Sequence, residues 1–277
     1  TKDMGVYVTG AGSSFTNEAT GTITNDGAYG MYAISGGVIN NKGVVANTGT
    51  KAFAIAANAQ GYNSGRIENN SSYGVYITGS GSSFTNEATG VIANRGNFGM
   101  DVGGDGIVIN NGLIQNEGNY GIYSKADTVV TSKPVIINNG TVHLTGNNKI
   151  AVFLNNSDFT NNGIIQIDGT NVIGISAENN SIVRIAQNSK IILNGNAPIT
   201  QAGTDYSDKT STGASNRNSA GRAYNIDATS TLINAGTILS RGRFIVEEEG
   251  KFILDTQTGS IEAPSLDLEG DMYVNAE

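Results

Sequence analysis

The stretch FTNEATG occurs twice in this chain, at Phe15–Gly21 and at Phe84–Gly90, and the match extends well beyond these seven residues. Of the 28 residues that start at Gly5, 20 are identical to those that start at Gly74, which lies 69 positions further on. A copy this faithful indicates an internal duplication. The chain is therefore a repeat protein, and the repeat governs how the rest of the sequence is interpreted.

The composition excludes several classes of function. Charged residues make up 14% of the 277 residues, below the roughly 25% of an average globular protein, and the net charge is −8. Basic residues are scattered rather than clustered, which argues against nucleic acid or an anionic membrane as the main partner. Without cysteine there are no disulfides, thiol catalysis or thiolate metal sites. Because the chain begins and ends within the repeat pattern, we expect it to be a piece of a longer array.

A shorter repeat lies inside the duplication. Apolar segments that end in an Asn- and Gly-rich turn recur at intervals of 22 to 28 residues, as in INNKGVV, INNGLIQ and TNNGIIQI. They alternate with a second kind of segment, of which GVYVTG, GMYAIS and KAFAIAA are examples. Both kinds are rich in β-branched residues that alternate with period 2, a pattern typical of half-buried strands. The 69-residue duplication therefore comprises three units of about 23 residues.

These units predict an all-β fold, a right-handed parallel β-helix of about 11 coils of roughly 23 residues, with almost no helix. In this interpretation Asn and Gly form the corners between strands because both tolerate positive φ. Antiparallel hairpins are the alternative use of Asn-Gly, but near-constant spacing of like segments favours stacking like upon like. A β-sandwich array and a propeller are the remaining alternatives.

Departures from the repeat predict three regions. Residues 1–200 are expected to form regular coils. Residues 201–222 lack alternation and are expected to be an inserted surface loop. Residues 223–277 are expected to continue the β-helix with shorter, altered coils.

One column of aromatic residues is predicted on the outside of the coils, because the flanking positions are apolar and should face inward. Its members are Tyr7, Tyr32, Phe53, Tyr76, Asp101, Tyr123 and Phe153. Such a column stabilises stacked strands whether or not a ligand is present, and it also supplies rigid contact area for a sugar or a protein. We take as candidate ligand-binding residues its members Tyr7, Tyr32, Phe53, Tyr76 and Tyr123, together with Asp205, Tyr206, Asp208 and Arg217 of the inserted loop.

Little in the sequence points to chemistry. The single histidine, His143, lies between Val142 and Leu144 and is expected to face solvent. With one histidine and no cysteine, transition-metal sites and Ser–His or Cys–His nucleophiles lack a second member. Asp101 and Asp105 lie close together, yet the coils above and below place tyrosines at the position of Asp101. We therefore predict no enzymatic activity, no metal and no cofactor.

Units such as GVYVTG…FTNEATGTI, VIGISAENNS and the NNG turns resemble the passenger repeats of large fusobacterial type V autotransporter adhesins of the RadD-like kind. The resemblance covers at least residues 5–194. It implies a long β-helical stalk at the bacterial cell surface, secreted across the outer membrane and anchored there by a C-terminal barrel outside this piece. It also implies attachment to other bacteria and to host cells, with no fixed catalytic residues.

The sequence thus favours an adhesin fragment that binds a glycan or protein receptor. The first alternative is a spacer that holds a binding tip away from the membrane and has no ligand of its own. A polysaccharide-cleaving β-helix enzyme is the less favoured alternative.

Overall fold

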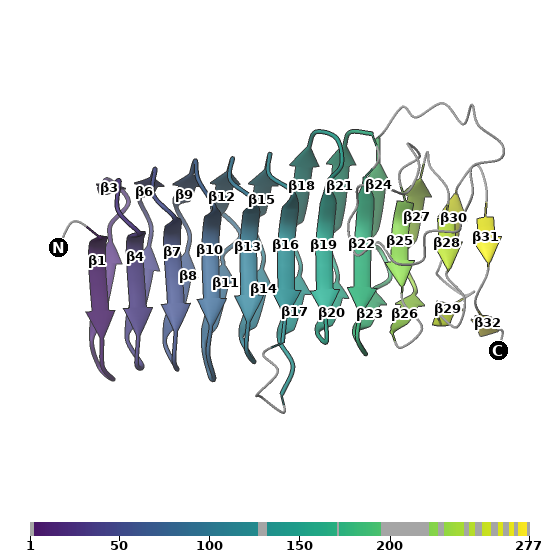
Figure 1. Ribbon diagram of the computed structural model, residues 1–277, viewed down its shortest axis with the longest axis horizontal. Coiled ribbons are helices and arrows are strands. Elements are labelled where there is room, and N and C mark those ends of the chain that lie inside the picture. Colours follow the sequence, from purple (N-terminus) through teal and green to yellow (C-terminus); the bar gives the residue numbers. More distant parts are fainter. Residues whose placement is uncertain are drawn as a thin grey trace.

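The structure is a computed structural model that describes residues 3–126, 132–170, 172–194, 222–226 and 230–240, together with the strands of residues 244–246, 251–255, 260–262, 266–268 and 271–275. The described residues contain no helix and form three parallel sheets along one long axis (Figure 1). The parallel β-helix predicted from the repeat is therefore confirmed, while its right-handed sense stays a prediction from the general rule for parallel connections.

Sheet A contains the first strand of each turn, and Figure 1 looks onto it. Its strands, in spatial order, are β1 (Met4–Thr9), β4 (Tyr29–Ile34), β7 (Lys51–Ala56), β10 (Tyr73–Thr78), β13 (Phe98–Gly103), β16 (Tyr120–Lys125), β19 (Ile150–Asn155), β22 (Ile173–Glu178) and β25 (Arg222–Ile226).

Sheet B contains the second strand of each turn and is the largest of the three. Its strands are β2 (Ser14–Asn17), β5 (Val38–Asn41), β8 (Gln60–Asn63), β11 (Ser83–Asn86), β14 (Ile107–Asn110), β17 (Val135–Asn138), β20 (Asp158–Asn161), β23 (Ile182–Ile185), β26 (Thr231–Asn234), β29 (Lys251–Asp255) and β32 (Asp271–Asn275).

Sheet C closes each turn. Its strands are β3 (Thr22–Asn25), β6 (Val44–Asn47), β9 (Arg66–Asn69), β12 (Val91–Asn94), β15 (Leu113–Asn116), β18 (Thr141–Thr145), β21 (Ile164–Asp168), β24 (Lys190–Leu193), β27 (Thr237–Ser240) and β30 (Ser260–Glu262). A separate pair is formed by β28 (Phe244–Val246) and β31 (Leu266–Leu268).

The strands from β1 to β24 make up eight complete turns, each with one strand from every sheet. This number is somewhat below the eleven coils predicted, although sheet B does reach eleven strands. From β25 on, strands continue to pair in parallel with those before them, β25 with β22 and β26 with β23. Of the loop predicted at 201–222, residues 201–221 lie outside the described residues and Arg222 begins β25, and the predicted region boundaries stay predictions.

The interior is filled by apolar residues stacked in register. On sheet A the inner column runs through Met31, Phe53, Val75, Met100 and Ile122, and none of these five side chains is exposed. Each turn adds its residues to one continuous core, so a turn is stabilised by both of its neighbours.

Buried asparagines, not positive φ, explain the turns after sheet B. Asn side chains at the last position of successive sheet B strands donate to one another in a ladder, at Nδ2–Oδ1 distances of 2.7 to 2.8 Å. The residues of this asparagine ladder are Asn17, Asn41, Asn63, Asn86, Asn110, Asn138 and Asn161. A second ladder along sheet C links Asn25 to Asn116 and ends there, where Leu144 takes the next position.

The prediction that the NNG corners need positive φ is wrong. Positive φ is found mainly at the corner after sheet A, for example at Ser35, Ala57 and Gly79, and also at Asn148 after sheet C and Asn188 after sheet B, neither of which belongs to an NNG segment. The glycine of NNG is required by close approach: a Cβ added to Gly112 would lie 2.2 Å from the carbonyl oxygen of Gly90 on the neighbouring turn.

Candidate functional site: an aromatic outer face

The outer surface of sheet A carries the predicted aromatic column. Strand pairing places its members directly above one another in the order Tyr7, Tyr32, Ala54, Tyr76, Asp101, Tyr123, Phe153 and Ser176. The predicted alignment of Tyr7, Tyr32, Tyr76 and Tyr123 is therefore confirmed. Tyr7 is the most exposed of these, at 52%.

The placement of Phe53 in this column is wrong. Phe53 pairs with Met31 and Val75, is fully buried, and packs edge-on against Phe84 with the ring centroids 5.4 Å apart. Ala54 takes the outward position. An aromatic residue fits either face of a strand, and Phe53 is the third residue of β7, whereas Tyr32 is the fourth residue of β4.

A second outer column was missed by the sequence interpretation. It runs beside the first, three residues earlier in each strand, through Met4, Tyr29, Lys51, Tyr73, Phe98, Tyr120, Ile150 and Ile173. Strict alternation puts residues three apart on opposite faces of a strand. Here the alternation is interrupted at the residue after the aromatic one: Gly30 and Met31 are both buried, so that Tyr29 and Tyr32 both point outward.

The signal for this second column was present in the sequence. An aromatic residue precedes glycine in YGMY, YGVY, FGMD and YGIY, the segments that begin β4, β10, β13 and β16. Glycine suits this position because a Cβ on Gly30 would lie 2.5 Å from the carbonyl oxygen of Ala52 on the next turn. An aromatic residue followed by such a glycine could therefore have been assigned to the outside.

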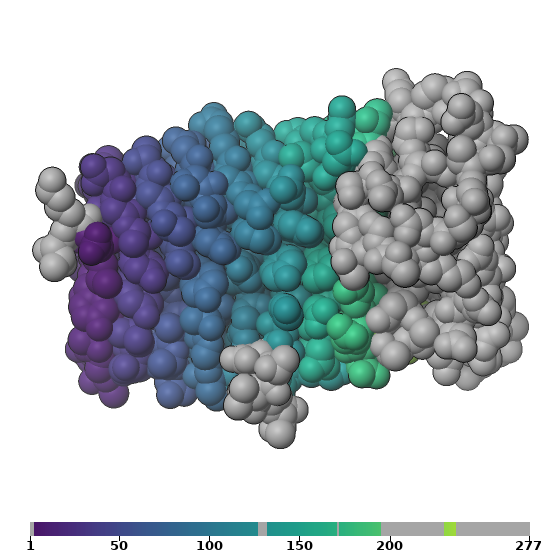
Figure 2. All heavy atoms as spheres, viewed as in Figure 1, coloured from purple at the N-terminus to yellow at the C-terminus, as the bar shows by residue number. Residues whose placement is uncertain are grey.

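Together the two columns form what we call the aromatic face. Its residues are Tyr7, Tyr29, Tyr32, Lys51, Tyr73, Tyr76, Phe98, Asp101, Tyr120, Tyr123 and Phe153. Figure 2 shows the molecule from the side of sheet A, where the side chains of successive turns form one continuous surface along the long axis.

Most rings of the aromatic face stack on one another along the axis. Tyr73, Phe98 and Tyr120 stack with centroid distances of 5.0 and 5.3 Å and interplanar angles of 9° and 11°. Tyr123 and Phe153 stack at 4.9 Å and 8°. Pairs in this geometry add about 0.5–1.5 kcal/mol beyond the area they bury. Where both faces of a ring are covered by other rings, a ligand can reach only the ring edge.

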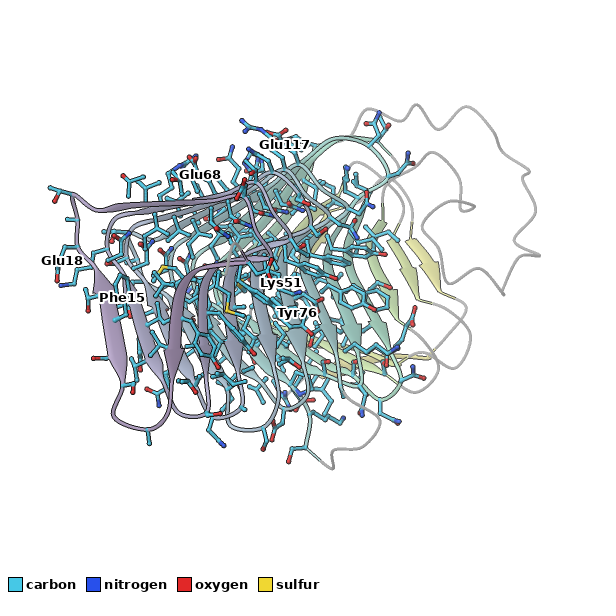
Figure 3. All side chains as sticks on the ribbon, turned by 60° about the vertical axis from the view of Figure 1, so that its left-hand side comes forward. Phe15, Glu18, Lys51, Glu68, Tyr76 and Glu117 are labelled. Atoms are coloured by element: carbon cyan, nitrogen blue, oxygen red, sulfur yellow. The ribbon has the colours of Figure 1, made fainter. Side chains whose placement is uncertain are left out.

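The third turn interrupts the rows of rings, because β7 has Lys51 and Ala54 at the two outward positions. The Lys51 ammonium lies over the rings of Tyr29, Tyr73 and Tyr76, at 5.0, 5.2 and 4.8 Å from their centroids. Figure 3 shows Lys51 and Tyr76 close together on this face. Burial lowers the pKa of Lys51, and the charge of Asp101 opposes this shift.

Asp101 stands in the column between Tyr76 and Tyr123. Burial raises the pKa of Asp101 to about 6, although the positive charge of Lys51 acts in the opposite direction. Its negative charge also contributes to the raised pKa values of Tyr73 and Tyr76, for which burial is the larger cause.

The raised pKa of Asp101 predicts a pH-dependent stability. The folded state holds this proton to a higher pH than the unfolded chain, so the associated stability is present at about pH 4 and is lost as the pH rises through about 6. Asp101→Asn should therefore raise the free energy of unfolding by about 1–3 kcal/mol near pH 7 and by much less near pH 4. Urea unfolding at pH 7 and at pH 4 measures this change in the free energy of unfolding. An equal change at both pH values would contradict the prediction.

No other described group resembles a catalytic or metal centre. His143 lies on the outer face of sheet C, half-buried, with its Nε2 2.7 Å from Oδ2 of Asp168. Within the described ranges no three or more His, Cys, Asp or Glu side chains are grouped so as to hold a metal ion. In register, Asp101 is flanked by tyrosines and not by carboxylates, as predicted.

The four loop candidates, Asp205, Tyr206, Asp208 and Arg217, lie outside the described residues. No helix in the described part of the chain is long and apolar enough to cross a membrane. Fold and outer surface thus define the class: a parallel β-solenoid with an aromatic face along one sheet. Comparison with known protein families, with characterised proteins and with solved structures found no match for this chain.

Proposed function

We propose that this chain is part of a bacterial cell-surface adhesin, and that its aromatic face attaches the cell to a receptor on another bacterium or a host cell. The single observation that supports this proposal is the row of outward tyrosines and phenylalanines on adjacent turns of one sheet. Tyrosine is among the residues that contribute most to the affinity of protein interfaces.

The solenoid is a suitable support for such a surface. Strands on both sides of each sheet A strand between β4 and β22 fix the backbone, and the rings are further ordered by contact with one another. Side chains that are ordered before binding lose little conformational entropy when a partner docks. The location at the cell surface and the anchor in the outer membrane belong to this proposal through the resemblance of the repeats.

A spacer without a ligand is the second candidate, and the ring stacking is the observation that favours it. Rings that cover one another stabilise the stack of turns on their own account. With a rise of about 4.8 Å for each turn, the eight turns span roughly 38 Å along the axis, which is the length that this segment would add to a spacer. We do not propose an enzyme, since the one carboxylate within the aromatic face has tyrosines as its neighbours in register.

Binding of the purified chain to partner bacteria and to host cells tests the proposal. The variant Tyr32→Ser/Tyr76→Ser/Tyr123→Ser should lower the apparent affinity at least about tenfold, because it removes three outward rings without touching the core. Tyr62→Ser is the matched control, since Tyr62 also points outward but lies on sheet B, and it should change affinity less than about twofold.

Two results would decide against an adhesive face here. A triple variant that is folded by circular dichroism and binds as well as the parent would place the receptor contacts elsewhere. A folded parent chain that binds no cell would favour the spacer.

A further inference from the structure

The third turn interrupts the aromatic face, because its strand of sheet A, β7, carries no outward aromatic ring. Between β4 and β19, β7 is the one strand of sheet A without an outward ring, since Lys51 and Ala54 replace the pair found as Tyr29 and Tyr32 one turn before. Tyr29 and Tyr73, the ring-bearing neighbours of Lys51 in its column, are two strand spacings apart, or about 9.6 Å.

Ring faces are turned toward this gap. Tyr73 is covered on one side by the stacked ring of Phe98, and the ammonium of Lys51 lies over it 5.2 Å from its centroid. Tyr29 stacks on Tyr32 of its own strand, with the ring centroids 4.8 Å apart, and the Lys51 ammonium lies over the Tyr29 ring 5.0 Å from its centroid. One side of the Tyr29 ring and one side of the Tyr73 ring therefore contact the flexible Lys51 side chain, whereas other rings of the aromatic face contact another ring there.

The gap also holds a positive charge, the Lys51 ammonium, which interacts electrostatically with Asp101. Among the described residues, Lys42 lies beside Glu18 at 3.1 Å and Lys133 beside Asp158 at 3.8 Å. Lys51 makes no such pair within the described residues, and its contacts there are with rings. A half-buried ammonium held among rings keeps its N–H donors for an acceptor from outside.

We propose that this gap binds a pyranose that carries a carboxylate, such as a uronic acid. The sugar ring lies between Tyr29 and Tyr73 in place of the Lys51 stem, and the Lys51 ammonium turns outward to pair with the carboxylate. A sugar ring at the level of β7 lies one strand spacing, about 4.8 Å, from the strands that carry Tyr29 and Tyr73. The inference rests on the proposed function and names the ligand chemistry of the same face.

The surroundings favour a sugar over an acidic peptide. An extended peptide usually gains affinity by pairing its backbone with an open sheet edge. Here β7 is already paired with β4 on one side and β10 on the other, so only side chains can contact the ligand. Those side chains are phenol rings with hydroxyls, which offer apolar faces to C–H groups and hydrogen bonds to sugar hydroxyls.

The movement required of Lys51 is small. Rotamer changes of partly exposed side chains take picoseconds to nanoseconds, and the lysine stem has four rotatable bonds to redirect its charge. The cation–π contacts that are given up are replaced by a charge-assisted pair with the ligand.

Titration of the chain with methyl β-D-glucuronide, followed by tyrosine fluorescence and by calorimetry, tests the inference; with no tryptophan present, the emission reports the tyrosines alone. We expect saturable binding, at least about tenfold weaker binding of the neutral methyl β-D-glucoside, and a similar loss for glutarate, which has carboxylates but no ring. Lys51→Met should lose at least about tenfold, and Lys51→Arg should retain most of the affinity. Lys42→Met, which removes an exposed cation from the turn after sheet B, should bind as the parent does.

Each contrary result is informative. Equal binding of glucuronide and glucoside, or parent-like binding by a folded Lys51→Met, would overturn the anionic subsite. Equal binding of glutarate would replace the sugar by a simple carboxylate. Attachment to cells, measured in parallel, separates the two proposals. If Lys51→Met attaches to cells as the parent does, the adhesin proposal stands although this inference fails. If the chain binds glucuronide but attaches to no cell, this inference stands although the adhesin proposal fails.

Discussion

Asn110→Ala is expected to lower the free energy of unfolding by about 2–5 kcal/mol. Asn110 is fully buried, donates from Nδ2 to Oδ1 of Asn138 at 2.7 Å, and accepts at Oδ1 from Nδ2 of Asn86 at 2.8 Å. Truncation removes both bonds, leaves the Oδ1 of Asn138 without its donor, and leaves the Nδ2 of Asn86 with only its bond to the carbonyl oxygen of Gly90 at 3.2 Å. Each such buried group costs about 1–3 kcal/mol.

The neighbouring residue provides the control. Asn111 has a partly exposed side chain that accepts a bond from Asn139 at 2.8 Å, and Asn111→Ala should cost less than about 0.5 kcal/mol. Urea unfolding followed by circular dichroism compares the two variants. Equal losses for Asn110→Ala and Asn111→Ala would mean that the asparagine ladder contributes no more than a solvent-exposed amide.

The asparagine ladder also marks the limit of what the sequence predicted. The repeat length and the period-2 pattern were enough for the parallel β-helix, because both depend on spacing along the chain. The role of Asn41 or Asn110 depends on which residue stands above it on the next turn, and that register is a property of the stack. The NNG segments were thus interpreted as turns with positive φ, whereas their asparagines bond between turns and their glycines avoid backbone contacts of about 2 Å.

The difference between spacing within one segment and register between turns also explains why the sequence predicted only part of the aromatic face. Tyr32 and Tyr76 were placed correctly because alternation within one strand is enough to assign them. Tyr29 and Tyr73 were missed because the glycine after each of them breaks the alternation. The charge environment of Lys51 arises from residues of three different turns, and no spacing within a single segment encodes it.

Phe53→Ala is the second large effect, expected to cost about 3–5 kcal/mol. The inner column of sheet B runs through Ile39, Gly61 and Phe84, so the third turn lacks a side chain at that point. A Cβ added to Gly61 would lie 2.7 Å from Cε1 of Phe53 and 2.7 Å from Cδ1 of Ile55, which shows that these two side chains fill the space that this glycine leaves. The large residue therefore points inward on the one turn whose neighbouring strand supplies no side chain.

Truncation at Phe53 would open a cavity in the core, and the cost grows with the volume left empty. Phe53→Leu should cost about 1–2 kcal/mol, because it keeps most of that volume. Tyr76→Ala, which removes a half-exposed outer ring beside Lys51, should cost less than Phe53→Ala. Thermal and urea unfolding rank the three variants, and a Phe53→Ala chain as stable as Tyr76→Ala would show that the ring does not fill the core. With the expected ranking, Phe53→Ala would affect cell binding only where it unfolds the chain, whereas outer-face variants such as Tyr76→Ala would affect it in a folded chain.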